Sequence, residues 1–488
     1  MLTYFERKSD SSALALASGL QRRLTFVRSF ARDEEGVMTY FAFFILFMML
    51  LVGGMGVDLM RNELERSKLQ ATLDRAILAA ADLEQTLTPE DVVEDYFDKS
   101  GLSDRLPAVT VSEDLTFRNV QADASARSPT RWMKFLGVDE LPMRAFGAAE
   151  ERVNAVEISL VVDISGSMRN NNKMANLQDA AKTFVDTVII PDNEDLISMS
   201  LVPYTASTNP GEAIFDELNI NRLHPFSSCV DFDEADFSTP GISLSQNYIH
   251  MQHFEASNAD PGAITNPGCP GRIADANFGI ADRSYEEIQA FSQNATALKD
   301  AIDQYTPRAN TAIHIGMKWG VAMLDPSFRP INAALASSGE SDSTFSNRPV
   351  AYNDPSTLKT VILMTDGENV NTIRVRDQFY NSSNERSFWA FNTLFEFAAR
   401  NGNFTAGQLA FNRFTAAQAD TMLINVCNAA KAEGILIWSI GFEVTDDSAI
   451  LMRNCASSPS NFFRVEGVEI SEAFEAIAKQ INQLRLTQ

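Results

Sequence analysis

The chain has 488 residues, of which 45% are hydrophobic and 9% are aromatic, and this is enough apolar material for several folded domains. Its formal net charge is −24, from 64 acidic and 40 basic residues. A protein that binds nucleic acid needs a basic surface to neutralise phosphates. The composition therefore excludes a disordered tail and argues against nucleic acid as a partner.

One long apolar segment near the amino end predicts a membrane anchor. Residues 37–57 carry no charge, and a helix of that length would be about 31 Å long, which matches the hydrocarbon thickness of a bilayer. By the positive-inside rule, the basic residues before it place residues 1–36 in the cytoplasm and everything after Asp58 outside it. These basic residues are Arg7, Lys8, Arg22, Arg23, Arg28 and Arg32.

Two other interpretations of this segment are weighed against the anchor. A cleavable secretory signal has a shorter apolar core, closer to the terminus, and ends in a small-residue cleavage site, and residues 37–57 do not fit this pattern. A pilin-type leader would be cut after Gly36. Pilins carry a glutamate five residues beyond the cut, whereas this chain has Phe41 there. We therefore expect an uncleaved anchor.

The residues after the anchor predict a helix and then a small mixed segment. Residues 58–87 are rich in helix formers and contain no glycine or proline. Their apolar face either packs on its own domain or forms a seam with a partner helix. Residues 88–150 follow as a small α+β segment, with a short helix expected at 128–137. The apolar face consists of Leu69, Leu73, Ala76, Ala80 and Leu83.

From residue 151 to residue 488 the pattern alternates between strands and helices. This alternation predicts an α/β fold with a doubly wound, mostly parallel sheet covered by helices on both faces. Two polar stretches, near 208–285 and 371–418, are too long for ordinary connections and could carry binding specificity or be surface decoration. The expected strands are 155–163, 195–204, 358–367 and 435–444, and the expected helices are 174–189, 311–324, 419–434 and 470–484.

All four cysteines lie beyond the anchor, in an even number that suits two disulfides in an oxidising compartment. The simplest of the three possible pairings joins Cys229 to Cys269 and Cys427 to Cys455. A zinc site is the competing interpretation for the first pair, because three histidines lie nearby in the sequence. The spacing contains no CxxC pair, so the disulfide is favoured. The histidines are His224, His250 and His253.

Oxygen-bearing side chains gather where the predicted strands end. The first strand closes on an aspartate that two serines follow, another strand closes on a second aspartate, and a threonine begins the helix between them. Ligands of an open parallel sheet bind outside the carboxyl ends of its strands, so we expect these side chains to meet. Two carboxylates and three hydroxyls favour magnesium or manganese. The five residues are Asp163, Ser165, Ser167, Thr311 and Asp366.

The DISGS sequence at residues 163–167 resembles the DxSxS signature of von Willebrand factor type A domains, and Thr311 and the TDG at 365–367 match their second and third metal-site segments. The resemblance implies a metal-ion-dependent adhesion site. In such a site Ser165, Ser167 and Thr311 would supply hydroxyl ligands, and Asp163 and Asp366 would bind directly or through water.

In this family one metal position stays open for a carboxylate of the partner. The chain departs from the family at Ala309 and Asn310, which replace the glycines usual before the threonine. A serine-rich helix cap is the plain structural alternative for DxSxS. His314 is expected to pack within its helix and not to bind metal.

The whole chain also resembles tight-adherence (Flp) pilus-assembly proteins of the TadG type. The resemblance rests on the basic amino end, the single span, LQATLDRAILAAA at 69–81, the WMKFLG and AFGAAE segments, and the carboxyl-terminal part from 427 onward. It implies the Cys427–Cys455 bridge, a bacterial inner-membrane anchor, a periplasmic type A domain, and a role with protein partners in assembling or anchoring pili.

Three functions follow. The first is a non-enzymatic pilus-assembly protein that binds a protein partner through a divalent cation. The second is an adhesion receptor that meets an outside surface, with its insertions beside the site. The third is a metal-dependent hydrolase, which ranks last because the sequence contains no GxSxG, HExxH or glycine-rich phosphate loop.

Overall fold

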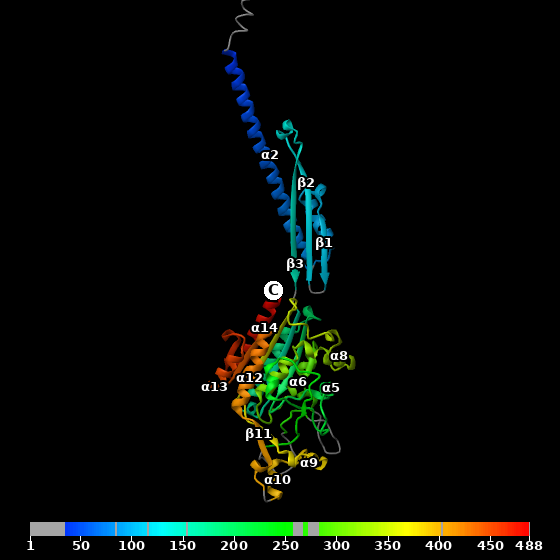
Figure 1. The fold of residues 1–488 in the computed structure, drawn as a ribbon, viewed down its shortest axis with the longest axis vertical. Helices are drawn as coiled ribbons and strands as arrows, with labels where there is room; N and C mark the ends of the chain where they lie inside the picture. The colour runs from blue at the N-terminus through cyan, green and yellow to red at the C-terminus, as the bar shows by residue number, and fades with distance from the viewer. Residues whose placement is uncertain are drawn as a thin grey trace, which may run out of the picture. The chain divides into compact units, whose positions relative to one another are not determined.

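The computed structural model forms two compact units, Met1–Glu151 and Arg152–Gln488 (Figure 1). Residues 1–34 of the expected cytoplasmic segment lie outside the described residues. The described residues are 35–82, 85–114, 117–152, 155–256, 267–271, 283–401 and 404–487.

In the first unit, the expected anchor and the expected membrane-proximal helix are one continuous helix, α2 (Glu35–Ala81). Its amino-terminal part is long and apolar enough to cross a membrane, with a mean hydropathy of 2.2 in the most apolar window. Most side chains of this part are exposed, as Phe44 is at 60%, whereas Leu51 is buried. The helix ends at Ala81, earlier than the expected residue 87, and Leu83 lies outside the described residues.

The carboxyl-terminal part of α2 packs on its own unit. This is the first of the two interpretations of its apolar face. Leu69 and Leu73 are fully buried in one apolar cluster with alternate residues of a three-stranded sheet, such as Val120 and Ala122. The period of two directs one face of the strand toward the helix. The other elements of this unit are α3 (Pro89–Lys99), β1 (Ala108–Asp114), β2 (Phe117–Pro129) and β3 (Glu140–Arg152), with strand order β1-β2-β3.

The helix expected at 128–137 is wrong. Strand β2 continues to Pro129, and only a single 3-10 turn, η2 (Met133–Leu136), follows. The Thr130 amide donates to the carbonyl of Asp139 at 2.9 Å, which closes the connection between β2 and β3. Gly137 ends the turn with a φ of 85°, a conformation that favours glycine. Sheet pairing therefore overrides the local helix signal.

The second unit contains the expected α/β sheet. Six strands lie in the order β13-β12-β9-β4-β5-β8, and all neighbours pair in parallel except the edge strand β8, which is antiparallel to β5. The strands are β4 (Ala155–Asp163), β5 (Ile197–Tyr204), β8 (Gln289–Ser292), β9 (Thr357–Thr365), β12 (Leu436–Phe442) and β13 (Phe462–Val465). All nine residues of the central β4 are buried, as a strand with both faces covered requires.

Helices cover both faces of this sheet, so it is doubly wound. Val156, Ile158 and Leu160 of β4 belong to one apolar cluster, whereas Val161 belongs to the other. The first cluster includes α4 (Lys173–Val188), α6 (Ala295–Gln304) and α14 (Glu469–Thr487). The second includes α5 (Gly211–Glu217), α7 (Ile313–Ala322), α8 (Arg329–Ser338), α12 (Ala416–Ala432) and α13 (Asp446–Cys455).

The two long insertions pack against each other. They share an apolar cluster that includes Phe254 from the first insertion and Val375 and Trp389 from the second. The buried guanidinium of Arg374 pairs with the buried carboxylate of Asp231 across them. Figure 1 shows α9, α10 and β11 together at one end of the unit. The elements are β6 (Val230–Asp231), β7 (Ile249–His250), β10 (Thr372–Val375), α9 (Ser383–Trp389), α10 (Leu394–Asn401), α11 (Ala406–Leu409) and β11 (Ala410–Phe414).

Candidate metal centre

The five oxygen-bearing residues predicted from the sequence meet at the carboxyl ends of β4 and β9. Their side chains form a continuous hydrogen-bonded row. The Thr311 hydroxyl donates to Ser165 Oγ at 2.8 Å, Ser165 Oγ and Ser167 Oγ lie 3.0 Å apart, and Ser167 Oγ donates to Asp366 Oδ1 at 2.6 Å. Asp163 adjoins this row because its Oδ1 accepts the Ser165 amide at 2.8 Å.

The carboxylate of Asp163 is fully buried and held on both sides. Its Oδ2 accepts a hydrogen bond from the Thr365 hydroxyl at 2.7 Å and from the Tyr204 hydroxyl at 3.3 Å. Burial raises the pKa of Asp163 to about 6, and the neighbouring charge of Asp366 adds to this rise. A cation at this site would relieve the repulsion between the two carboxylates.

Sequence reasoning missed two residues of the site. Tyr204 ends β5, and the strand register pairs it with Asp163, so its place at a neighbouring strand end was a usable signal. Lys173 is the first residue of α4, and its Nζ lies 3.0 Å from Asp366 Oδ2 and 3.7 Å from Glu443 Oε2. A lysine at the start of a helix carries no pattern that would have identified this contact.

The hydroxyl spacing fits a small hard cation. Magnesium binds oxygen ligands at about 2.1 Å in octahedral geometry, which places neighbouring ligand atoms about 2.9 Å apart. The oxygens of Ser165, Ser167 and Thr311 lie 2.8 and 3.0 Å apart along the row. No three His, Cys, Asp or Glu side chains in the described part of the chain form a group that could hold a metal ion, so a cation here would depend on the hydroxyl oxygens as well as on the two carboxylates. The residues present therefore suit magnesium or manganese.

The loop before Thr311 adopts the shape that glycine normally provides. Ala309 has a φ of 52°, in the left-handed region, and its carbonyl accepts the Gly166 amide at 3.1 Å. A Cβ added to Gly166 would lie 2.9 Å from that carbonyl oxygen, so the two loops approach closely. The replacement of glycine by Ala309 thus keeps the loop in place and adds backbone strain.

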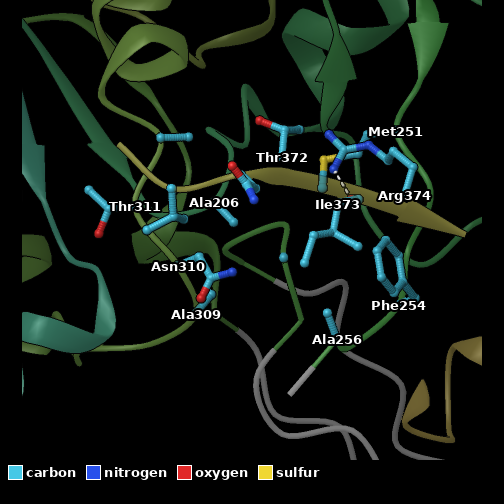
Figure 2. Close-up of a pocket in the computed structure, with 14 residues that line it drawn as sticks. Ala206, Met251, Phe254, Ala256, Ala309, Asn310, Thr311, Thr372, Ile373 and Arg374 are labelled. Atoms are coloured by element: carbon cyan, nitrogen blue, oxygen red, sulfur yellow. Dashed lines mark hydrogen bonds between the residues drawn. The ribbon is translucent and has the colours of Figure 1, made fainter. Parts of the chain in front are cut away.

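A cavity of about 140 Å³ lies beside this loop (Figure 2). Asn310 and Thr311 line one part of the cavity, and both insertions contribute to the rest, with Phe254 from the first and Ile373 and Arg374 from the second. Figure 2 shows the side chains of Phe254 and Ile373 side by side, and Arg374 Nη1 donates to the carbonyl of Ile373 at 2.7 Å. The insertions therefore border the candidate metal centre.

The cysteines pair as expected. Cys229 is bonded to Cys269, with Cα atoms 5.8 Å apart, and Cys427 of α12 is bonded to Cys455 of α13, with Cα atoms 5.2 Å apart. The competing zinc interpretation of the first pair is wrong, because two sulfurs joined in a disulfide offer no thiolate to bind zinc.

The nearby histidines pack instead of binding metal. The rings of His224 and His250 lie 3.9 Å apart between centroids, and each ring nitrogen has a backbone partner. His253 Nδ1 lies 2.9 Å from Ser227 Oγ. His314 is fully buried in α7, and its Nδ1 lies 3.2 Å from Asn369 Oδ1, as expected for a packing residue.

Comparisons with known proteins give one family match and several similar solved structures. Residues 36–83 match the Flp pilus-assembly TadE/G-like family. Among curated protein sequences, none matches the chain. Similar solved structures include the vWF domain of the type V pili tip protein Mfa5 from Porphyromonas gingivalis, which is 14% identical with a TM-score of 0.35, over 69% of this chain and 97% of that chain.

Two further structures are similar. The adhesive tip pilin GBS104 from Group B Streptococcus agalactiae is 12% identical with a TM-score of 0.33, over 67% of this chain and 100% of that chain. The pilus adhesin SpaC from Lactobacillus rhamnosus GG is 14% identical with a TM-score of 0.30, over 78% of this chain and 34% of that chain. Residues 36–83 are thus similar to the TadE/G-like domain of Flp pilus-assembly proteins, and this similarity supports a pilus-related protein associated with a membrane.

Proposed function

We propose that this protein is a non-enzymatic component of Flp (Tad) pilus assembly, and that its second unit binds a protein partner through magnesium or manganese. The observation that carries the proposal is the row of hydroxyl oxygens of Ser165, Ser167 and Thr311, with spacings of 2.8 and 3.0 Å that suit neighbouring ligands of one cation.

Each residue of the centre has a distinct role in this proposal. The hydroxyls of Ser165, Ser167 and Thr311 hold the cation, and Asp366 orients Ser167 through the 2.6 Å hydrogen bond. Asp163 orients the Ser165 loop from its buried position. When bound, the cation supplies positive charge that attracts a carboxylate of the partner. The attraction also requires a coordination position of the cation that the protein leaves open.

The surroundings of the centre support binding in preference to catalysis. The chain has four histidines, and at least one ring nitrogen of each lies within hydrogen-bond distance of a backbone group, Ser227 or Asn369. The four cysteines are in disulfides. The cavity between Asn310 and the insertions offers apolar contact next to the cation. A partner could therefore place a carboxylate on the metal and an apolar side chain in the cavity.

The proposal places α2 across the bacterial inner membrane once, with the amino end in the cytoplasm and the bulk of the chain in the periplasm. The basic residues before the apolar run support this orientation. Two disulfides suit the oxidising side of that membrane.

Thermal unfolding of the full chain in detergent, with and without magnesium or manganese, tests the metal centre. A cation present at about ten times its dissociation constant should add about 1.4 kcal/mol to the free energy of unfolding. The Thr311→Val variant keeps the shape of the side chain but removes the hydroxyl, so it should lose this gain. Ser337→Ala, which removes an exposed hydroxyl in α8, should keep it. An equal gain in Thr311→Val, or none in the wild type, would contradict the proposal.

Cell experiments separate the pilus-assembly role from a surface adhesion receptor. Insertions beside the candidate centre would also suit a receptor that meets an outside surface. If the protein stays at the inner membrane, protease added to intact cells should leave it uncut, and Thr311→Val cells should assemble fewer pili. Cleavage of the second unit on intact cells would favour the receptor.

A further inference from the structure

The connection between β2 and β3 lies against the apolar part of α2. We call residues 130–138 the tip loop. A Cβ added to Gly54 of α2 would lie 2.3 Å from two ring carbons of Trp132, so the indole rests directly on the glycine. Gly54 is three residues inside the end of the uncharged run 37–57. Figure 1 shows the connection between β2 and β3 reaching along α2.

A buried carboxylate fastens the tip loop to the helix. Asp58 is the first charged residue after the apolar run and is 5% exposed. Its carboxylate accepts hydrogen bonds from three successive backbone amides of the loop, those of Arg131 at 3.1 Å, Trp132 at 2.7 Å and Met133 at 2.8 Å. Hydrogen bonds to a charged carboxylate are stronger than those between neutral groups. They therefore fix the position of the tip loop along the axis of α2.

The covered face of α2 extends well into the apolar run. Leu51, Gly54 and Asp58 share one helix face and are buried, whereas Leu50 and Val52 on other faces are 53% and 58% exposed. From Leu51 to Asp58 the helix rises about 10 Å. The tip loop and the residues around it therefore cover one face of α2 over the last two turns of its membrane-crossing part.

The outer surface of the tip loop combines apolar and basic side chains. Phe135 is 74% exposed, Leu136 56% and Trp132 37%. Arg131 and Lys134 are also exposed, and the sequence contains no acidic residue from 128 to 138. Aromatic side chains concentrate at membrane–water interfaces, and basic side chains there attract anionic phosphate groups. Exposed aromatics at this level of a membrane helix thus fit a lipid surface.

We propose that the tip loop inserts into the boundary between headgroups and acyl chains, in the leaflet from which the Asp58 end of α2 emerges. Trp132, Phe135 and Leu136 enter the lipid, and Arg131 and Lys134 contact lipid phosphates. This second contact fixes the height and rotation of the first unit at the membrane. The proposal rests on α2 crossing the membrane and is independent of the candidate metal centre.

Photo-crosslinking tests this insertion on the full chain in vesicles of phosphatidylethanolamine and phosphatidylglycerol. A benzophenone amino acid replaces Phe135 in one protein and Phe146 in a matched control. Phe146 is also exposed, at 61%, but its carbonyl accepts a hydrogen bond from Gln70, about 18 Å along α2 beyond Asp58. Mass spectrometry should find lipid adducts at Phe135 about fivefold or more above those at Phe146.

Adduct yields no higher at Phe135 than at Phe146, or crosslinks from Phe135 mainly to protein, would overturn the insertion. A third protein with the probe at Phe44, in the exposed apolar part of α2, separates the possible failures. Lipid adducts at Phe44 without adducts at Phe135 would overturn the tip-loop proposal alone. No adducts at Phe44 would overturn the membrane crossing on which it rests.

Discussion

The ammonium of Lys173 lies 3.0 Å from Oδ2 of Asp366, while Oδ1 of the same carboxylate accepts a hydrogen bond from Ser167. Both side chains of the ion pair are almost fully buried. Lys173 thus partly neutralises a carboxylate that the proposed divalent cation would also neutralise. The two positive charges act on one carboxylate, so Lys173 should weaken cation binding and at the same time stabilise the protein without the cation.

We therefore expect Lys173→Met to make unfolding more dependent on magnesium. Removal of one partner from a buried ion pair costs about 3–5 kcal/mol, and a bound cation would recover part of this loss. Thermal unfolding with a magnesium titration measures both effects. The control is Lys182→Met on the same helix, because Lys182 is more exposed and pairs with the partly exposed Asp303.

The expected result for Lys173→Met is a lower melting temperature without magnesium and a larger rise with it than in the wild type. Lys182→Met should behave like the wild type, since exposed ion pairs contribute about 1 kcal/mol or less. A magnesium response identical in Lys173→Met and the wild type would show that the lysine and the cation do not compete for Asp366.

Ala309→Gly should stabilise the second unit. Ala309 has a φ of 52°, and a left-handed conformation costs a residue with a Cβ about 1 kcal/mol relative to glycine. Ala333, exposed within α8, provides a control of opposite sign, because glycine in a helix costs about 0.5–1 kcal/mol relative to alanine. Urea unfolding compares the two variants. A loss of stability in Ala309→Gly would mean that the freedom of glycine in the unfolded chain outweighs the relieved strain.

The strands and helices around the candidate centre could be predicted from the sequence, because the strands are nearly continuous apolar runs and the helices have apolar residues at helical spacing. The predicted strand 155–163 coincides with β4. The edge strands β8 and β13 were missed, since four residues are too few for a period to appear. The helix expected at 128–137 is wrong because Thr130 pairs with Asp139 across the β2–β3 connection, a contact between strand ends that local helix propensity does not report.

The candidate centre also contains residues that could be predicted from the sequence and residues that could not. Asp163 and Asp366 could be predicted because both lie at the carboxyl ends of buried strands, and the same rule applies to Tyr204 at the end of β5. Lys173 could not, since its contact depends on where the long side chain reaches after α4 packs on the sheet. The packing of one insertion on the other depends on tertiary contacts between residues such as Phe254 and Trp389, which are far apart in the sequence.

Acid should destabilise the region around His224 and His250. The pKa of His224 is lowered to about 3 and that of His250 to about 4, mainly by burial, with the charge of His250 acting on His224 and the charges of Arg222 and Arg386 acting on both. The unfolded histidines have pKa values near 6.5. Below that pH the unfolded chain binds the extra protons, so stability is present above pH 6.5 and is lost as the pH falls toward 4.

At pH 5 the expected loss is about 2 kcal/mol for each histidine relative to pH 7.5. Urea unfolding at both pH values measures it, with His250→Gln as the comparison, because glutamine does not titrate. Glu286 acts in the opposite direction, since burial raises its pKa to about 7, and the difference between the two proteins removes its contribution. An equal pH dependence in the wild type and His250→Gln would contradict the assignment to His250.

The ion pair between Asp231 and Arg374 should hold the two insertions together. Arg374 Nε donates to Asp231 Oδ2 at 2.9 Å, both side chains are 5% exposed, and Arg374 also lines the cavity beside the candidate centre. In Asp231→Asn the guanidinium stays buried without a countercharge, so the free energy of unfolding should fall by about 3–5 kcal/mol. The control is Asp233→Asn, because Asp233 is 69% exposed in its pair with Arg413, and its loss should be about 1 kcal/mol or less.

Replacement of both partners, in Asp231→Asn with Arg374→Gln, should recover part of the stability because no unpaired charge remains. Urea unfolding of the three variants provides the measurement, and equal losses in the two single asparagine variants would show that the insertions do not depend on this pair.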